Sequence, residues 1–528
     1  MSCSKLFSGD LPELTNEIIK NFQNDYSTLY SCALVNRLWC RLAIPLLWEN
    51  PFSIPAGNYN FIEVYLYNLN DCLKSKLNEY QIIDHYLSPL NTLFNYPRFI
   101  RYLSMCKIAS SIDRWLEAND IISKFSNRYS ESIFEFKRLI EMSLIKLFIE
   151  NEANLHTFEI KLDTYRNKYC DNILESILQN PNFINNTKNL KTSLFGSNTP
   201  TKNRISQIIN SHQNLKRMLL GYMSYDTLSL YQSLLLSKES NCSNTLNTII
   251  FYYIDFKGIS NLAKVFENLN VLESVHIIYC FSLNSFTQQI INLTKPFKLK
   301  SLFINGKLQI DSLQSSLQSL LQKSGYYLEN FGFGVTIYNQ LTNQQLLELI
   351  IKYCRNIKFL DLYKIETHIT SLVFSLIENI KQNLNYLSTS IGNCQDSNIE
   401  LILQNLGQAL PSKLEYLSLI PYFIKANDFE VFLKNSQDTF FKKLLINNMT
   451  REYNNDIDIL PYIKEYIMKK KRVKYLAIKN TSTLGFNGND IDLSNFKDEV
   501  KEFKSHDIKV LSYINLSTNI YNFVNEID

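Results

Sequence analysis

The stretch LEYLSL, residues 414–419, decides the fold because the chain repeats its pattern many times. Apolar residues fill its first, fourth and sixth positions, which are Leu414, Leu417 and Leu419. We number the positions of this phrase as slots, starting at slot 1 with the first apolar residue. Alternation of apolar and other residues predicts a β-strand with slots 4 and 6 facing a core and slots 3, 5 and 7 facing away from it. The clearest other copies are LKSLFI at 299–304, IKFLDL at 357–362 and VKYLAI at 473–478.

The phrase recurs at a regular interval over the last two thirds of the chain. Stretches with helical periodicity, such as NQQLLELIIKYCR and NIELILQNLGQAL, lie between the copies, so each unit is predicted to be strand, turn and helix. The interval of about 29 residues resembles that of the longer, helix-containing leucine-rich repeats. That resemblance implies an α/β fold, a horseshoe-shaped solenoid of about twelve repeats over residues 151–528. The predicted starts are Leu155, Leu190, Leu215, Leu246, Leu272, Leu299, Leu328, Ile357, Leu384, Leu414, Phe441 and Val473.

Aromatic residues gather in the slots that face away from the predicted core. Four of them share slot 3 in the later repeats, where Lys443 stands in the one intervening repeat, and a fifth fills slot 7. Such a row is typical of a protein-binding surface, and we predict that it binds a substrate protein. An alternative stays open, in which the rings stack along neighbouring strands or lie under the C-terminal tail. The five candidate residues are Phe359, Tyr363, Tyr386, Tyr416 and Tyr475.

The first fifty residues carry more apolar surface than two short helices can bury between them. In LYSCALVNRLWCRLAIPLLW, residues 29–48, the only polar residues are Ser31, Asn36, Arg37 and Arg41. A unit of this size buries too little of its surface to be stable alone, so the cover must come from outside it. Either the remaining chain packs on these helices or a partner protein does.

The motifs LPELTNEII and CALVNRLWCRLAIPLLW, in this order, resemble the F-box. The matching positions are Leu11, Pro12, Glu17, Ile18, Val35, Arg37, Trp39 and Trp48. The resemblance implies helices that dock on a small adaptor protein, which links them to a cullin in a RING-type ubiquitin ligase. The implied adaptor-binding residues are Leu11, Pro12, Ile18, Leu34, Val35 and Trp39.

Three segments are predicted from these patterns. The F-box-like helical domain covers residues 8–55, because Pro45, Pro51 and Pro55 break the helical pattern near its end. Residues 56–150 are predicted to be a helical linker and the N-terminal cap of the solenoid. Within this segment, Ser132 and Glu135 have the spacing of a capping box at the start of an apolar helical run. The repeats follow over residues 151–528.

Composition excludes several classes of function. The chain has 54 Lys and Arg against 50 Asp and Glu, and this balance is too even for the chain as a whole to be a nucleic-acid binder. Its 10 cysteines form no CxxC motif, so we interpret them as reduced and mostly buried thiols. The sequence shows no secretory signal and no apolar run long enough to span a bilayer, so we expect a cytoplasmic or nuclear protein, or one found in both compartments.

Residues that could do chemistry are present but do not form a site. His156 and Glu159 point to opposite faces of a strand, and the GFG motif at 332–334 is better explained as a thinly filled strand. The KKKR run at 469–472 follows a helical stretch, where cations complement exposed carbonyls. We therefore predict no catalytic residues, no metal and no cofactor.

The combined prediction is a substrate-recognition adaptor of an SCF-type ubiquitin ligase, with no enzymatic activity of its own. Its partners would be the small ligase adaptor, a cullin through it, and an unknown protein substrate, with neither nucleic acid nor a membrane involved. The alternative is a leucine-rich-repeat scaffold or inhibitor with no ubiquitin role.

Overall fold

The computed structural model divides the chain into two units. The first comprises Met1–Ile249 and Asn268–Val271, and the second comprises Ile250–Glu267 and Leu272–Asp528. We describe each unit by itself. The structure describes residues 11–23, 25–54, 59–80, 92–125, 131–162, 167–194, 199–212, 214–223, 241–304, 313–333, 340–365, 367–391, 399–422, 426–450, 459–482 and 490–527.

The first unit begins with three short helices around a small core. They are α2 (Pro12–Lys20), α3 (Tyr26–Ala33) and α4 (Arg37–Leu47), and the core consists of Ile19, Leu29, Cys32, Trp39 and Ala43. Side chains cap two of the helices, as Asp25 accepts the amide of Thr28 and Asn36 accepts the amide of Trp39. The predicted break at Pro45 is wrong. Pro45 lies inside α4, where its missing amide removes one hydrogen bond, the one to the carbonyl of Arg41, without ending the helix.

Within the described residues from 59 to 150, the first unit has four further α-helices. The predicted helix is present as α8 (Glu131–Glu150), and Ile133, Phe136, Ile140 and Leu144 of its apolar run are buried. It begins one residue before Ser132, so Ser132 lies inside the helix, and the capping box stays a prediction. The predicted boundary near residue 55 lies outside the described residues. The other three helices are α5 (Phe61–Tyr67), α6 (Asp71–Asn78) and α7 (Met105–Ala118).

Parallel strands of the first unit pair in chain order. Phe158 lies opposite Leu190, and Leu190 lies opposite Met218. Since Phe158 and Met218 both occupy slot 4, Leu190 does too, and the predicted start at Leu190 is three residues late. Thr187, which is fully buried, fills slot 1, and a polar residue in that slot hid the repeat. The elements are β1 (Tyr102–Ser104), β2 (Thr157–Leu162), β3 (Asn189–Leu194), β4 (Arg217–Met223), α9 (Asn167–Leu178) and α10 (Thr199–Ser211).

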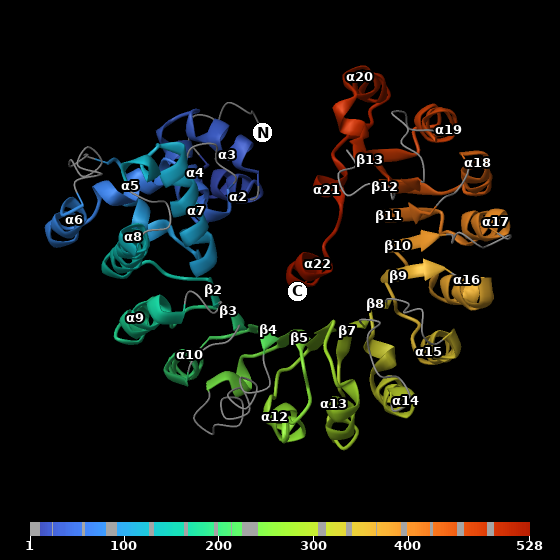
Figure 1. Ribbon diagram of the computed structural model, residues 1–528, viewed down its shortest axis with the longest axis horizontal. Coiled ribbons are helices and arrows are strands. Elements are labelled where there is room, and N and C mark those ends of the chain that lie inside the picture. The colour runs from blue at the N-terminus through green and yellow to red at the C-terminus, as the bar shows by residue number, and fades with distance from the viewer. Residues whose placement is uncertain are drawn as a thin grey trace. The chain divides into compact units, whose positions relative to one another are not determined.

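The second unit repeats strand, turn and helix along the chain. Its helices lie on one face of a curved sheet (Figure 1). The strands are β5 (Thr248–Ile254), whose first two residues belong to the first unit, β6 (Ser274–Ile278), β7 (Leu299–Ile304), β8 (Asn330–Phe333), β9 (Phe359–Ile365), β10 (Tyr386–Ile391), β11 (Lys413–Pro421), β12 (Phe440–Thr450) and β13 (Val473–Ser482). The helices are α12 (Leu262–Asn268), α13 (Leu283–Ile290), α14 (Leu313–Ser324), α15 (Gln340–Tyr353), α16 (Thr370–Ile380), α17 (Ile399–Ala409), α18 (Ala426–Asn435) and α19 (Leu460–Ile463).

Strands β7 to β13 confirm the predicted repeat starts from Leu299 to Val473. Each pair of neighbouring strands places one slot-4 residue opposite the next: Leu302, Phe331, Leu360, Leu387, Leu417, Leu444 and Leu476. The predicted start at Leu272 does not fit this register. Ile277, not Val275, lies opposite Leu302, after a shift of register within β6.

The chain ends on the face of the sheet opposite the helices. After β13 come β14 (Ile491–Asp492), which pairs with β13 antiparallel, and α20 (Lys497–Ser505). We call residues 508–527 the C-terminal segment. It contains β15 (Lys509–Val510), which pairs with β13 in parallel, then α21 (Tyr513–Leu516) and α22 (Ile520–Ile527), both of which lie inside the curve of the strands (Figure 1).

Several cysteines and the helix lengths fit the expectations from composition. Cys32, Cys242, Cys280 and Cys354 are buried, and burial raises the pKa of the Cys280 thiol to about 12. Within the described part of the chain, no helix combines the length and the apolar character that crossing a membrane requires.

Gly332 on β8 shows why the GFG motif has so little side-chain volume. It pairs with Phe303 on β7 and Asp361 on β9. A Cβ atom on Gly332 would lie 2.6 Å from Cδ1 of Phe303, whose ring crosses the glycine to reach Phe359 with 5.8 Å between ring centroids. The interpretation as a thinly filled strand is confirmed for Gly332, whereas Gly334 lies outside the described residues.

We expect Gly332→Ala to destabilise the second unit by about 1–3 kcal/mol, because the ring of Phe303 must move to admit the new methyl group. Urea unfolding followed by circular dichroism measures the change. In a Phe303→Leu background the same substitution should cost less, since the shorter side chain leaves room. An equal cost in both backgrounds would show that the ring is not the cause.

Candidate functional site

Stacked aromatic rings form the most distinctive surface of the second unit, on the face of the strands opposite the helices. Because β9, β10 and β11 pair in register, Phe359, Tyr386 and Tyr416 lie opposite one another. The centroids of Phe359 and Tyr386 are 5.6 Å apart, and those of Tyr386 and Tyr416 are 5.9 Å apart. Offset-stacked rings at these distances stabilise one another and present a rigid apolar surface.

The row of rings extends further than the sequence indicated. Phe303 joins Phe359 across Gly332, Tyr279 lies 6.3 Å from Phe303, and Tyr253 lies 5.4 Å from Tyr279. We call this set, from Tyr253 to Tyr416, the aromatic ladder. Tyr253 and Tyr279 both have positive φ, at 53° and 54°. This conformation is uncommon and strained for a bulky residue, and such strain tends to occur at functional sites. The slot pattern did not indicate either tyrosine, because hydrophobic periodicity does not reveal a positive φ.

The C-terminal segment covers the middle of the aromatic ladder. The ring of Phe523 lies 4.4 Å from that of Phe359 and 5.2 Å from that of Tyr386, and the backbone amide of Thr518 donates to the Tyr416 hydroxyl at 3.2 Å. Phe359 is consequently only 1% exposed and Tyr416 only 3%. Both features of the alternative that the sequence left open, stacking along strands and burial under the tail, are therefore present.

Tyr475, another of the predicted substrate-binding residues, lies beside this cover. Tyr475 on β13 is partly exposed and packs against a buried cluster of Tyr416, Leu445, Ala477 and Leu516. Tyr363 is on β9, but its side chain lies outside the described residues. Substrate binding by all five residues stays a prediction.

Asp361 places a carboxyl group among these rings. It occupies slot 5 of β9, where burial raises its pKa to about 6, partly offset by a hydrogen bond with Ser388. Burial raises the pKa values of Tyr279, Tyr416 and Tyr513, and the charge of Asp361 adds to each shift. The site can therefore change its charge over a mildly acidic pH range.

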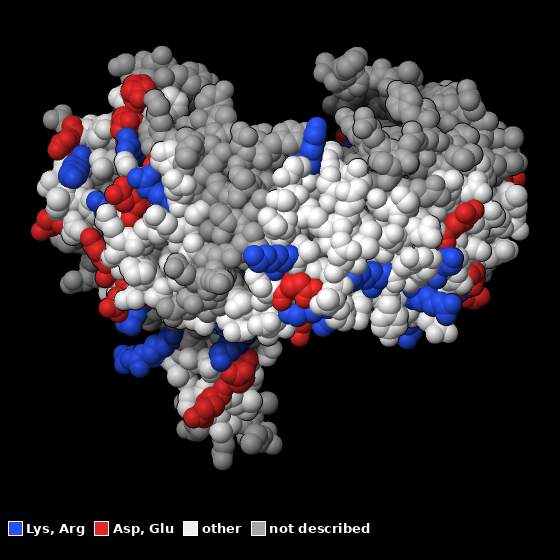
Figure 2. Space-filling model, turned by 90° about the horizontal axis from the view of Figure 1, so that it is seen from below, with Lys and Arg blue, Asp and Glu red and all other residues white. Residues whose placement is uncertain are grey.

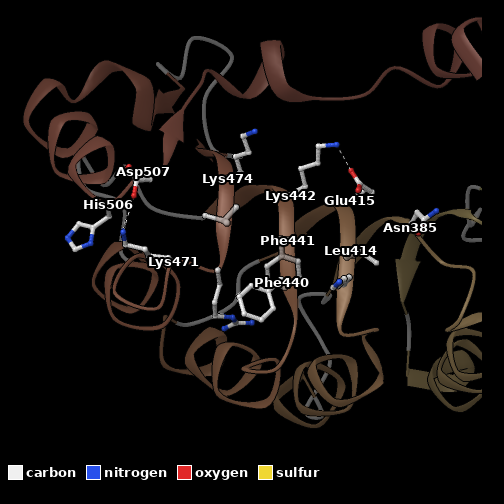
Figure 3. A pocket seen from close by; sticks show the side chains of 13 residues that line it. Asn385, Leu414, Glu415, Phe440, Phe441, Lys442, Lys471, Lys474, His506 and Asp507 are labelled. Carbon is white, nitrogen blue, oxygen red and sulfur yellow. Dashed lines mark hydrogen bonds and ion pairs between the residues drawn. The ribbon is translucent and has the colours of Figure 1, made fainter. Parts of the chain in front are cut away.

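A second candidate site is a groove of about 570 Å³ where β11, β12 and β13 begin (Figure 3). Two of its lysines are already paired, Lys442 with Glu415 at 2.7 Å and Lys471 with Asp507 at 2.9 Å (Figure 3). Phe440 is 56% exposed at its margin. Paired charges of this kind favour a structural explanation over an anion site.

Arg472 lies beneath that groove and completes the KKKR run. It is buried, and its guanidinium donates to the carbonyls of Thr439 at 3.0 Å, Tyr466 at 3.3 Å and Ser436. Burial lowers its pKa to about 10. The contact with Tyr466 lies in the helical stretch before the run, as the sequence predicted, whereas Ser436 follows the end of a different helix, α18.

The N-terminal helices expose apolar side chains although their own core is closed. Leu34 is 71% exposed and Val35 is 46% exposed, at the junction of α3 and α4. Pro12 is exposed, and Leu11 and Ile18 are partly exposed. Trp39, by contrast, is buried in the three-helix core, so it supports this surface from beneath.

Sequence analysis missed two members of the same surface. Leu14 lies one turn from Leu11 and from Ile18 on α2, and Tyr30 lies one turn before Leu34 on α3. Both are exposed. Helical spacing alone places each of them one turn from a predicted residue, so this spacing could have identified both.

The distribution of charged side chains on the surface does not favour a strongly charged partner. On the face seen in Figure 2, basic and acidic side chains are interspersed among uncharged residues. Among the described residues, no three His, Cys, Asp or Glu side chains gather closely enough to hold a metal ion.

Comparisons with known proteins add little to this description. No sequence profile of a known family matches the chain, and no curated protein matches it. Among solved structures, it is similar to the leucine-rich repeat-containing protein LegL7 from Legionella pneumophila, with 14% identity and a TM-score of 0.33. The match covers 60% of this chain and 93% of that one. Such a score carries no argument, and the repeat architecture rests on the strand register described above.

Stability should fall between pH 4 and pH 6 because of Asp361. Its folded pKa of about 6 exceeds the ordinary value of 3.8, so the folded state holds this proton more tightly. The stabilisation that the protonated Asp361 gives to the folded state is fully present below pH 4, and it is lost as the pH rises through 6. A full shift of this size corresponds to about 3 kcal/mol, and the partial solvent contact of Asp361 makes the expected loss smaller.

Asp361→Asn should remove this part of the pH dependence. Urea unfolding of both proteins from pH 4 to pH 7 measures it, and the variant should gain stability relative to the native protein as the pH rises. Asp498→Asn, which changes a fully exposed carboxylate on α20, is the control and should leave the profile unchanged. Parallel profiles for Asp361→Asn and the native protein would contradict the prediction.

Proposed function

We propose that this protein is the substrate-recognition subunit of an SCF-type ubiquitin ligase. Its N-terminal helices would bind the small ligase adaptor, and through it a cullin, while its repeats would bind a target protein. It would catalyse nothing itself, because ubiquitin transfer belongs to other subunits. The proposal combines the F-box resemblance of residues 11–48 with the surfaces of two parts of the chain.

One observation carries the adaptor half of this proposal. Within the motif LVNRLW, Leu34 and Val35 point outward while Trp39 closes the core. A helical unit that seals its own core and still exposes large apolar side chains is typical of a protein-binding surface. Leu11, Pro12 and Ile18 on α2 add to the apolar surface that a partner groove would cover.

The aromatic ladder supports the target-binding half. Stacked rings supply a large contact area at little cost in conformational entropy, and aromatic residues are enriched in binding hot spots. Phe359, Tyr386 and Tyr416 form its centre, with Tyr475 beside them and Tyr363 on the same strand as Phe359. A target protein would reach these rings only where the C-terminal segment gives way.

We expect Leu34→Asp with Val35→Asp to weaken adaptor binding by at least about tenfold, because each change puts a charge where apolar contact is required. The melting temperature should change by less than about 2 °C, since both side chains are exposed. Biolayer interferometry with purified adaptor protein measures the affinity, and thermal scanning measures stability. Leu401→Asp alters another exposed leucine, on α17, and is the matched control.

Two results would contradict the ligase proposal. One is adaptor affinity that survives the double substitution. The other is native protein that captures neither adaptor nor cullin from cell extract, as identified by mass spectrometry. The second result would favour the leucine-rich-repeat scaffold or inhibitor with no ubiquitin role.

A further inference from the structure

The C-terminal segment occupies the aromatic ladder in the way that a bound peptide would. Its anchors are apolar side chains set into the rings: Leu516 is buried against Tyr416 and Leu445, and Phe523 lies between the rings of Phe359 and Tyr386. Val524 is fully buried. Large anchors that fill pockets, with polar residues around them, are the usual anatomy of a protein–peptide contact.

Two parts of the segment are attached differently. Around α21, the amide of Tyr513 donates to Asp492 at 2.8 Å, the hydroxyls of Tyr513 and Ser418 lie 3.4 Å apart, and Leu516 belongs to a buried cluster. Beyond Leu516, the amide of Thr518 donates to the Tyr416 hydroxyl, and the rings of Phe523 and Tyr521 lie against those of Phe359 and Tyr252. The last eleven described residues lie beyond both the strand pairing of β15 and the buried cluster around Leu516.

Helix α22 is amphipathic, as its sequence IYNFVNEI indicates. Phe523 and Val524 face the rings or the core, whereas Asn522 and Glu526 are exposed. An isolated helix of this length is not stable in water, so its structure depends on docking. A short helix that forms only when it is docked belongs to the class of elements that open locally without global unfolding.

We propose that residues 517–527 are an exchangeable cover, and that the aromatic ladder takes a partner segment of the same chemistry. That segment is a short amphipathic helix with adjacent aromatic and β-branched aliphatic anchors, equivalent to Phe523 and Val524. The inference rests on the target-binding half of the proposed function and not on the adaptor half. Because the cover and the partner compete, the apparent affinity for a partner is reduced by the fraction of molecules whose cover is closed.

A peptide supplied separately tests this exchange without knowledge of the target. The probe is a fluorescein-labelled peptide of residues 517–527, titrated with the full chain and with a Phe523→Ser, Val524→Ser double variant. The double variant loses the anchors of its own cover, so it should bind the peptide at least tenfold more tightly than the native chain. A peptide with the same two serines should bind neither protein. Fluorescence anisotropy reads the binding.

A matched variant separates the anchors from helix α22 as a whole. Asn522→Ser with Glu526→Gln changes two exposed positions of the same helix and should bind the peptide no better than the native chain. Hydrogen exchange with mass spectrometry should show faster exchange of residues 517–527 in the Phe523, Val524 variant alone. Exchange of β10 and β11 should be the same in all three proteins.

Two outcomes would overturn the proposal. In the first, the double variant exchanges rapidly over residues 517–527 but does not bind the peptide, so the exposed ladder takes no helix. In the second, both the double variant and a chain ending at Leu516 lose the cooperative unfolding of the repeats, so the segment is a permanent part of the core. Neither assay uses adaptor protein, so failure of the peptide exchange leaves the adaptor half of the proposed function untouched. If the peptide exchange succeeds and adaptor binding fails, only the ligase assignment is overturned.

Discussion

Parallel pairing in constant register is the constraint on which the second unit depends. From β7 to β13 each strand sets its slot-4 side chain opposite that of the next strand, and these residues form one continuous row of the core. A slip of one residue would turn every such side chain to the opposite face. The same register aligns the neighbouring slots, so it stacks Phe359, Tyr386 and Tyr416, and in slot 2 it brings Glu329 between Lys300 and Lys358.

Much of this fold could be predicted because apolar spacing reports the core directly. Seven consecutive repeat starts, from Leu299 to Val473, were correct for that reason. Spacing fails where a polar residue is buried in the core, as at Thr187, or where a strand shifts its register, as within β6. Pro45 was misjudged because a proline removes one hydrogen bond to the preceding turn without necessarily ending the helix.

The candidate site was less accessible to the same reasoning. Slot positions predicted a row of aromatic side chains, but they carry no information on what lies above that row. The contact of Tyr416 with Thr518 joins residues 102 positions apart, and no local pattern specifies such a contact. Tyr253 and Tyr279 join the ladder through positive φ angles, which hydrophobic periodicity does not reveal. By contrast, Leu34 and Val35 of the N-terminal helices lie within one short motif, so a local pattern was enough to single them out.

The two short strands on the outer edge of β13 have a consequence for how the repeats end. β15 pairs with Tyr475 and Leu476 in one direction, and β14 pairs with Lys479 and Asn480 in the other. A parallel sheet that stopped without them would offer a row of free amides and carbonyls to any extended chain. Because the two strands run in opposite directions, a further repeat or a second molecule finds no continuous template for strand addition. This edge of β13 is thereby less open to strand addition by another chain.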